Sequence, residues 1–420
     1  MMYKKVLIIA IIIKLSGSLL VFGQTGNIHL SWTGKSKPDA AHTMAINWNA
    51  YVSNSIVRYG EDSLQLNFTK RVKPIEVFNN GVRSYNYKLR LSCLKPGLTY
   101  YYQCGSEGSD WTAIYSFKTA PIQGSQDKYV VGVWGDTQNN TGNLRFEQTQ
   151  KVIRLMTKYP LNLSIHMGDI VENGSVENTW YQFLKVAQPV TAIAPFMPAL
   201  GNHDVNNKAN EAGFQKPFSV FYNSFNLPRD NLNYSYDYGN IHFVVVNSGF
   251  AQGAAKEGRT LMQKGSTDYN WLDRDLASAK KNKNITWIIL YAHYPIYSFG
   301  VSHVPEWQYN LLPLIDKYQV DLCLTGHRHV YERHKAIRNG KEYQQTDPMH
   351  YNHPTGTVYI TNGSSGGSLQ GLGGNQMSSI IFTAKEKVYT YAIMTVHGPK
   401  ITYDVYDINN NKIDSFSLVK

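Results

Sequence analysis

From about residue 26 to residue 120, the chain carries short segments in which apolar and polar residues alternate or in which Tyr, Val, Ile and Thr dominate. Turn-forming residues separate these segments, as expected for β-strands joined by loops. Strands are predicted over residues 29–32, 43–49, 55–59, 85–91, 99–104 and 114–119. Six or seven strands in about 95 residues match the size of a small β-sandwich.

The pattern changes after a polar linker at residues 121–126. Short apolar runs now alternate with longer segments of helical spacing, such as 146–159, whose apolar side chains recur every three or four positions. Strands are predicted over 129–134, 161–166, 196–200, 241–247, 286–292, 320–324, 357–361, 388–396, 400–407 and 413–419, and helices over 146–159, 176–186, 271–281 and 307–318. Strands that alternate with helices predict an α/β core.

The N-terminus has the pattern of an export signal. Lys4 and Lys5 precede an apolar run, which ends in small or polar residues at Gly23 and Gln24. Lys14 interrupts the run, which disfavours a lasting membrane anchor, because a span needs about 20 apolar residues. Residues 1–24 are therefore predicted to be a signal peptide, and the protein to be secreted, periplasmic or at the cell surface; an uncleaved N-terminal anchor is the alternative.

Charge and cysteine content narrow the picture only slightly. The formal charge of +11 falls to +8 without the three lysines of the predicted signal, and a positive surface favours anionic substrates. Because Lys and Arg form no dense run, no nucleic-acid partner is expected. Cys93 and Cys104 flank a turn and could form a disulfide in an oxidising compartment, whereas Cys323 lies in an apolar strand and is expected to be buried.

Residues of metal-binding type follow five of the predicted strands. The carboxyl ends of strands are where ligands collect in α/β sheets, and a preceding Gly lets the backbone turn sharply. These residues are Asp136 after strand 130–134, Asp169 after 163–167, Asn202 after 197–200, His293 after 288–292, and His327 with His329 after 322–324. Neutral imidazole is the commonest protein ligand of transition metals. The arrangement therefore predicts a two-metal hydrolase.

The order of these motifs resembles that of the calcineurin-like metallophosphoesterases, and more narrowly that of the purple acid phosphatases. The match is most specific at Gly201-Asn202-His203-Asp204 and at the run from His327 through Tyr331-Glu332-Arg333. Residues 94–100 also resemble the tyrosine corner of fibronectin type III domains. The resemblance implies a fibronectin III-like all-β sandwich over residues 25–121 and a catalytic four-layer αββα sandwich over residues 127–420.

Roles carried over from this resemblance imply two divalent metal ions, either Fe, Zn or Mn, that share Asp169. The first metal would bind Asp136, Asp169 and His329, and the second Asp169, Asn202, His293 and His327. His203 would donate to a phosphoryl oxygen or protonate the leaving group, and Asp204 could orient its imidazole. His303 falls near the position of a substrate-contacting histidine of the family, on spacing alone; an exposed loop histidine is the alternative.

Two positions depart from the purple acid phosphatase pattern. Those enzymes place a tyrosine, whose phenolate binds ferric iron, three residues after the bridging aspartate, but this chain has Glu172. The purple colour should therefore be absent, and two divalent ions are favoured. Gln138 stands where the purple enzymes usually have Gly and many relatives have a ligating His; its carbonyl could bind the metal weakly or hydrogen-bond a bridging water.

The leading interpretation is an exported phosphoesterase that hydrolyses phosphomonoesters with a metal-activated water, as acid phosphatases do. A phosphodiesterase or nucleotide pyrophosphatase on the same metal site is a second enzyme reading. A catalytically idle surface-binding protein that uses its β-sandwich for adhesion is the third, although a relic has no need to keep six ligand-type residues. The expected partner is a small phosphorylated substrate, and the sequence does not determine the oligomeric state.

Overall fold

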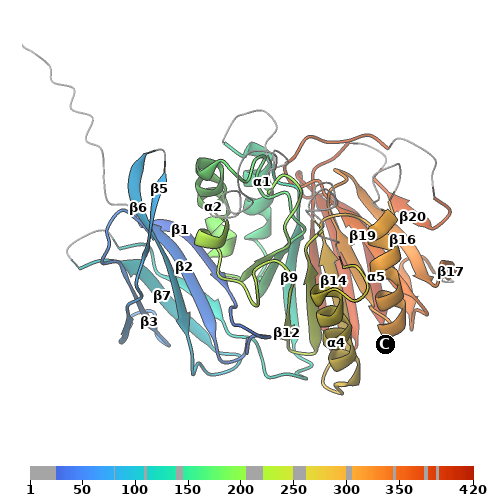
Figure 1. The fold of residues 1–420 in the computed structure, drawn as a ribbon, viewed down its shortest axis with the longest axis horizontal. Coiled ribbons are helices and arrows are strands. Elements are labelled where there is room, and N and C mark those ends of the chain that lie inside the picture. The colour runs from blue at the N-terminus through green and yellow to red at the C-terminus, as the bar shows by residue number, and fades with distance from the viewer. Residues whose placement is uncertain are drawn as a thin grey trace, which may run out of the picture.

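A computed structural model of the chain describes residues 25–79, 81–107, 111–138, 145–204, 221–248, 262–298, 305–343, 347–372, 377–384 and 387–420. The predicted signal peptide lies outside these residues. Figure 1 shows a purely β region formed by the N-terminal part of the chain beside a larger region of sheets and helices. Within the described residues, no helix is long and apolar enough to cross a membrane.

The N-terminal region contains two four-stranded antiparallel sheets, in the orders β1-β2-β6-β5 and β4-β3-β7-β8. Their strands are β1 (Gly26–Ser31), β2 (Met44–Ala50), β3 (Ile56–Gly60), β4 (Phe68–Lys70), β5 (Ile75–Asn79), β6 (Val82–Leu91), β7 (Thr99–Gly105) and β8 (Tyr115–Lys118). The Tyr100 hydroxyl accepts the backbone N–H of Lys95 at 2.9 Å, which is the contact expected of a tyrosine corner. Cys93 and Cys104 are both free thiols, so the disulfide that the sequence allowed is not formed.

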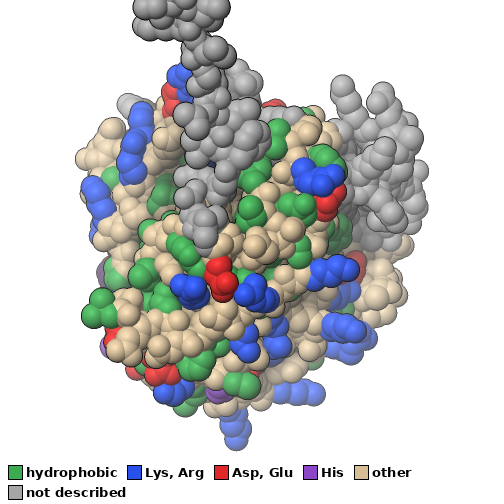
Figure 2. Space-filling view, turned by 90° about the vertical axis from the view of Figure 1, so that its left-hand side faces the viewer, with side chains coloured by type: hydrophobic (Ala, Val, Ile, Leu, Met, Phe, Trp, Pro, Cys, Tyr) green, Lys and Arg blue, Asp and Glu red, His purple; other side chains and the backbone are tan. Residues whose placement is uncertain are grey.

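The outer face of this N-terminal region carries more Lys and Arg than Asp and Glu, as Figure 2 shows. The cations are spread over the face among other side chains and form no dense run. This distribution accounts for part of the positive charge of the chain.

Two mixed sheets form the larger region. The seven-stranded sheet has the order β11-β10-β9-β21-β22-β23-β18, and the eight-stranded sheet has the order β12-β13-β14-β15-β19-β16-β17 with β20 paired to β16. The first contains β9 (Lys128–Trp134), β10 (Leu163–His166), β11 (Phe196–Pro198), β18 (His350–Asn352), β21 (Thr390–His397), β22 (Lys400–Asp407) and β23 (Lys412–Val419). The second contains β12 (Tyr234–Tyr238), β13 (Ile241–Val246), β14 (Trp287–Ala292), β15 (Leu322–Thr325), β16 (Tyr331–Arg338), β17 (Lys341–Tyr343), β19 (Thr357–Asn362) and β20 (Ile380–Thr383).

Helices cover the outer side of each sheet, which gives the four-layer αββα sandwich that was expected (Figure 1). The four helices predicted from apolar spacing are confirmed as α1 (Glu147–Met156), α2 (Glu177–Thr191), α4 (Thr267–Lys281) and α5 (Pro305–Tyr318). Leu272 and Leu276 of α4 pack with Leu311 and Leu314 of α5 against the outer face of the eight-stranded sheet. Burial of a leucine contributes roughly 1.5–3 kcal/mol, so these contacts hold the helices on the sheet.

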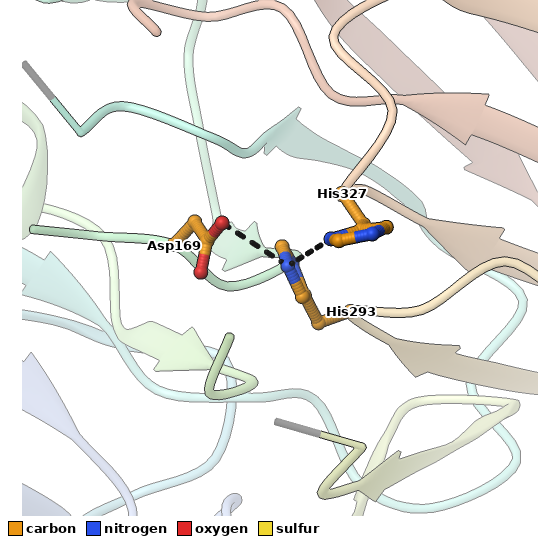
Figure 3. A group of neighbouring side chains, drawn as sticks. All are labelled: Asp169, His293 and His327. Carbon is orange, nitrogen blue, oxygen red and sulfur yellow. Dashed lines mark hydrogen bonds and ion pairs between the residues drawn. The ribbon is translucent and has the colours of Figure 1, made fainter. Parts of the chain in front are cut away.

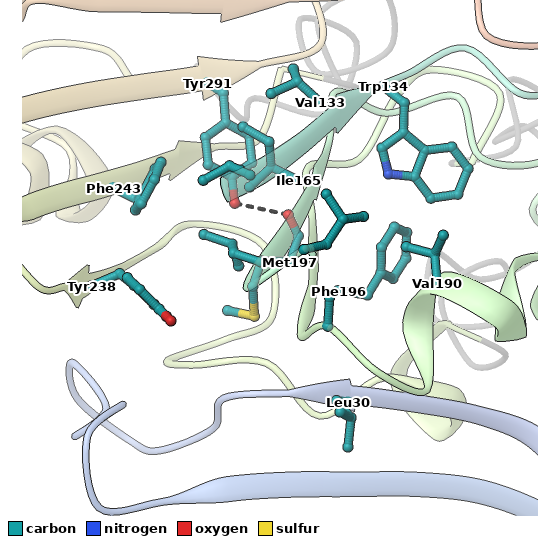
Figure 4. Packing of buried hydrophobic residues seen from close by; sticks show 14 of the residues in the cluster. Leu30, Val133, Trp134, Ile165, Val190, Phe196, Met197, Tyr238, Phe243 and Tyr291 are labelled. Atoms are coloured by element: carbon teal, nitrogen blue, oxygen red, sulfur yellow. Dashed lines mark hydrogen bonds between the residues drawn. The ribbon is translucent and has the colours of Figure 1, made fainter. Parts of the chain in front are cut away.

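The main core lies between the two sheets and continues into the N-terminal region. In Figure 4, Val133, Ile165 and Met197 of the seven-stranded sheet face Tyr291 of the eight-stranded sheet. The Tyr291 hydroxyl donates to the Met197 carbonyl at 2.8 Å, which satisfies its polar tip within the core. Leu30 of β1 belongs to the same cluster. The N-terminal sandwich is therefore packed onto the α/β region through a shared hydrophobic core.

Several strands were not predicted from the apolar pattern of the sequence, and β16 shows why. This strand is almost fully buried, yet Glu332, Arg333 and His334 stand in a row within it. The guanidinium of Arg333 pairs with both carboxylate oxygens of Asp414, at 2.7 and 3.0 Å, and the Tyr331 hydroxyl donates to the same carboxylate at 2.7 Å. A partner from a distant strand makes these polar residues compatible with burial, and a search for apolar runs misses them.

Candidate metal centre

The strand-end residues that the sequence singled out converge beyond the carboxyl ends of β9, β10, β11, β14 and β15. Three of them adopt the left-handed backbone conformation, with φ of 53° at Asp136, 51° at Asp169 and 66° at His327. Residues other than glycine rarely adopt this conformation, which costs about 1–3 kcal/mol where it is strained. Its occurrence at three converging residues is typical of a functional site.

Two glycines make room for the carboxylates. A Cβ atom on Gly326 would lie 2.2 Å from Asp136 Oδ2, and one on Gly201 would lie 2.1 Å from Asp169 Oδ1. Both distances are far inside van der Waals contact. Only glycine therefore allows the backbone to approach the two carboxylates this closely.

One group of donor atoms is formed by Asp136, Asp169 and His329, whose potential ligand atoms all lie within 4.8 Å of one another. His329 Nε2 lies 3.4 Å from Asp136 Oδ1. The opposite ring nitrogen, Nδ1, lies 2.5 Å from the carbonyl of Ser368. This carbonyl fixes the tautomer and leaves Nε2 free to face the carboxylates.

A second group is formed by Asp169, His293 and His327, which point toward one another in Figure 3. His293 Nε2 lies 3.2 Å from Asp169 Oδ2 and 3.2 Å from His327 Nδ1. The amide oxygen of Asn202 lies 3.0 Å from each of these imidazole nitrogens. His293 Nδ1 donates to the Met167 carbonyl at 2.9 Å, so Nε2 faces the cluster. The two groups share Asp169.

The charges of the cluster are strongly coupled. Burial opposes the protonation of His293, but the adjacent Asp169 carboxylate outweighs it and raises the His293 pKa to about 9. Burial likewise opposes the ionisation of Asp169, but His293 outweighs it and holds the pKa of Asp169 well below its usual range. Burial raises the pKa of Asp136. A bound cation would replace the protons that otherwise balance these carboxylates.

Two buried oxygen atoms indicate that the donor set fits a metal. Asp136 Oδ2 is buried and has no hydrogen-bond partner among the residues that the structure describes, and the same is true of Gln138 Oε1. The amide nitrogen of Gln138 lies 3.1 Å from Asp169 Oδ2 and 3.0 Å from His329 Nε2. Because the oxygen and nitrogen of an amide are assigned from their contacts, rotation of this group would turn its oxygen toward the first donor group. Oxygen and imidazole donors of this kind suit Zn, Fe and Mn.

His203 lies at the edge of the cluster with a side chain that is 33% exposed. Its backbone N–H donates to Asp169 Oδ1 at 2.8 Å, and its Nε2 lies 4.0 Å from Asp169 Oδ2. Its Nδ1 lies 3.0 Å from the carbonyl and 3.3 Å from the carboxylate of Glu172. The hydrogen bond to Glu172 raises the pKa of His203 to about 10, so that both ring nitrogens carry protons.

The expectation that Asp204 orients the His203 imidazole is wrong in this structure. The Asp204 carboxylate accepts the backbone N–H groups of Ile170 at 2.8 Å, Val171 at 3.0 Å and Gly201 at 2.8 Å. These three bonds hold the loop after Asp169 against the Gly201 turn. The carboxylate therefore faces the backbone, and Glu172 is the residue beside the imidazole.

His303 lies outside the residues that the structure describes. The sequence did not predict the backbone carbonyl groups that orient two histidines of the site. The Met167 carbonyl orients His293, and the Ser368 carbonyl orients His329. The sequence missed Tyr294 as well, whose ring centroid lies 4.0 Å from that of His327. The sequence shows that Tyr294 directly follows His293, but it does not show that Tyr294 contacts His327, which follows a different strand.

Comparison with known families accounts for both regions of the chain. Residues 129–331 match the model of the calcineurin-like phosphoesterases, and residues 25–119 match that of the purple acid phosphatase N-terminal domain. The chain thus belongs to the metal-dependent phosphoester hydrolases. Within them it is a purple acid phosphatase-like protein, and that family uses a binuclear metal centre.

Individual relatives support the same assignment. Human acid phosphatase type 7 is 28% identical over 365 residues, which cover 81% of this chain and 77% of the human protein. Purple acid phosphatase 21 of Arabidopsis thaliana is 27% identical over 68% of this chain and 59% of its own length. The purple acid phosphatase PPD1 from yellow lupin seeds has the same fold, with a TM-score of 0.77 at 20% identity over 94% of this chain and 74% of the lupin chain.

Proposed function

We propose that this protein is an exported acid phosphatase-like enzyme that hydrolyses phosphomonoesters. The observation that carries the proposal is the pair of buried donor groups that share Asp169. A shared carboxylate between two groups of ligand atoms is the geometry that a bridged pair of metal ions needs.

The ligand sets follow from the two groups. Asp136, Asp169 and His329 would hold one metal ion, with Gln138 as an additional oxygen donor. The second ion would take Asp169 together with Asn202, His293 and His327. When bound, such a pair of divalent ions supplies a water of lowered pKa and neutralises the negative charge of a phosphate ester.

The chain itself supplies the proton for the leaving group. Hydrolysis breaks the bond between phosphorus and the ester oxygen, and the departing alkoxide needs a proton. His203 carries a proton on Nε2, on the partly exposed side of the cluster, while Glu172 holds the opposite ring nitrogen. Asp204 keeps the loop of Asp169 in place through its three backbone hydrogen bonds.

Export rests on the predicted signal peptide at residues 1–24. The alternative of a catalytically idle protein has a precedent in the family, since an Arabidopsis relative that is 27% identical is named probable inactive purple acid phosphatase 9. The buried orphan oxygens of Asp136 and Gln138 support a functional centre here, because an apo relic would gain stability by losing them.

The test is hydrolysis of p-nitrophenyl phosphate and bis-p-nitrophenyl phosphate by the purified protein, with and without added Mn, Zn or Fe. We expect metal-dependent turnover of the monoester that exceeds turnover of the diester. His203→Asn should lose activity while its metal content stays unchanged, and His350→Asn, at an exposed histidine paired with Asp347, should serve as the matched control. Faster diester turnover would favour the phosphodiesterase reading. No turnover of either substrate with any metal would refute both enzyme readings.

A further inference from the structure

A polar cavity lies beside the amino-terminal end of β15, whereas the metal centre lies at the carboxyl ends of the strands. It encloses about 300 Å³ and includes in its lining Lys280, Asp316, Asp321, Arg338, His353 and Lys420. Asp321 directly precedes β15, and the metal-centre residue His327 follows the end of the same strand. The chain end that is marked C in Figure 1 lies beside the lower ends of α4 and α5, where this cavity is found.

One cation of the cavity, Lys420, forms an ion pair with a carboxylate. Lys420 Nζ lies 2.7 Å from Asp321 Oδ1 and also donates to the Thr286 carbonyl at 2.6 Å. The other oxygen of Asp321 accepts the backbone N–H of Ile288 at 2.8 Å, at the start of β14. This pair therefore ties the C-terminal residue to the sheet and needs no further partner.

The other two cations, Lys280 and Arg338, form no ion pair with a carboxylate among the described residues. Lys280 Nζ donates to the amide oxygen of Gln319 at 2.8 Å, which is a neutral partner. Arg338 Nε is buried without a hydrogen-bond partner. Burial, together with the nearby charges of Lys420 and Arg338, lowers the pKa of Lys280, while Asp321 acts in the opposite sense. The cations thus repel one another across the cavity.

The other carboxylate of the lining, Asp316, offsets this repulsion only in part, because burial raises its pKa while the charge of Arg338 lowers it. Asp316 Oδ2 accepts the backbone N–H of Asn339 at 3.0 Å, and no ion pair joins Asp316 to Lys280 or Arg338 in the described part of the chain. The position of Lys280 in the last turn of α4 suits the helix dipole. That explanation does not extend to Arg338, which ends strand β16.

We propose that this cavity binds a small oxyanion with two negative charges, held between Lys280 and Arg338. A guanidinium pairs with two oxygens of such an anion at once, and an ammonium adds a point charge from the other side. The site is separate from the metal centre by the length of β15 and its flanking residues, roughly 20 Å. Its occupation requires neither the metal ions nor the proposed hydrolase activity.

The test uses inorganic sulfate as the probe and thermal unfolding of the full chain as the measurement. Sodium chloride at equal ionic strength accounts for general screening, and a chelator removes the contribution of the metal centre. We expect 10 mM sulfate to raise the melting temperature by about 2 °C more than chloride does, as ligand binding to the folded state alone requires. Calorimetric titration with sulfate should show one site.

Matched variants connect the effect to the cavity. Lys280→Gln and Arg338→Gln should each remove most of the sulfate-specific shift. Arg274→Gln on the exposed side of α4, which is not part of the lining, should retain it in full. Because Lys280 is exposed at the end of its helix, its variant is expected to fold even if Arg338→Gln does not. A sulfate shift equal to that of chloride, or an equal sulfate shift in Lys280→Gln and Arg274→Gln, would overturn the proposal.

Discussion

The buried histidine His242 makes the stability of the protein depend on pH in a defined direction. Its side chain is fully buried between two carboxylates, with Nδ1 2.6 Å from Asp237 and Nε2 2.9 Å from Asp275. Lys37 pairs with the second oxygen of Asp237 at 2.7 Å, and the Ser235 hydroxyl donates to Asp275 at 2.8 Å. The imidazole can satisfy both carboxylates only when both of its nitrogens carry protons.

The magnitude follows from the shift in pKa. Burial opposes the protonation of His242, but Asp237 and Asp275 outweigh it and raise its pKa from 6.5 to about 9. Each unit corresponds to about 1.4 kcal/mol, so protonation of His242 contributes roughly 3 kcal/mol to the free energy of unfolding. Since the folded pKa is the higher one, this contribution is fully present below pH 6.5 and is lost as the pH rises through about 9.

The assay is urea unfolding followed by tryptophan fluorescence at pH 6, 7.5, 9 and 10, with His242→Gln beside the wild type. Glutamine keeps some hydrogen bonding to the carboxylates but does not titrate. At pH 6 the variant should be less stable than the wild type by roughly 3 kcal/mol. At pH 10 the imidazole of the folded wild type has lost its extra proton, so the difference should shrink to near zero.

The control is His42→Gln, because His42 pairs with Asp39 at 2.8 Å on the surface, where both side chains are about half exposed. An exposed pair of this kind contributes little, so His42→Gln should follow the wild type at every pH. A difference between His242→Gln and the wild type that stays constant from pH 6 to pH 10 would refute the reasoning.

Three further predictions concern the metal centre. Asp169→Asn should lower the content of both metal ions, whereas Asp136→Asn should lower mainly that of one; elemental analysis of the purified variants measures this. An equal loss of metal in the two variants would contradict a shared ligand. Glu172→Gln should slow hydrolysis of alkyl phosphates about tenfold and of p-nitrophenyl phosphate less, because a good leaving group needs less protonation; equal slowing in kcat would count against a positioning role through His203. The metal-loaded protein should lack a strong visible absorption band, since Glu172 replaces the tyrosine of the purple enzymes, and a purple preparation would disprove this.

Much of the fold could be read from the sequence because the relevant signals are local. An apolar run followed by Gly and a polar residue places that residue at a strand end, whatever else the chain does. For this reason Asp136, Asp169, Asn202, His293, His327 and His329 could be proposed together before any coordinates were known, and the structure brings them together. The four helices followed from apolar spacing in the same way.

Pairing between distant segments could not be read in this way. Asp204 is the nearest carboxylate to His203 along the chain, yet Glu172, which is 31 residues away, lies beside the imidazole. The buried strand β16 depends on Asp414, which is 81 residues from Arg333. Neither Asp414 nor Glu172 carries a local signal of its partner.

The sequence by itself thus determined the order of strands and helices and the types of donor that meet at the carboxyl ends of the strands. The tertiary structure decided which carboxylate serves which imidazole, and it revealed the cavity between Lys280 and Arg338. The physical reason is that secondary structure follows from periodicity along the chain, whereas a buried polar group takes whichever partner the packing of distant segments brings within hydrogen-bond distance.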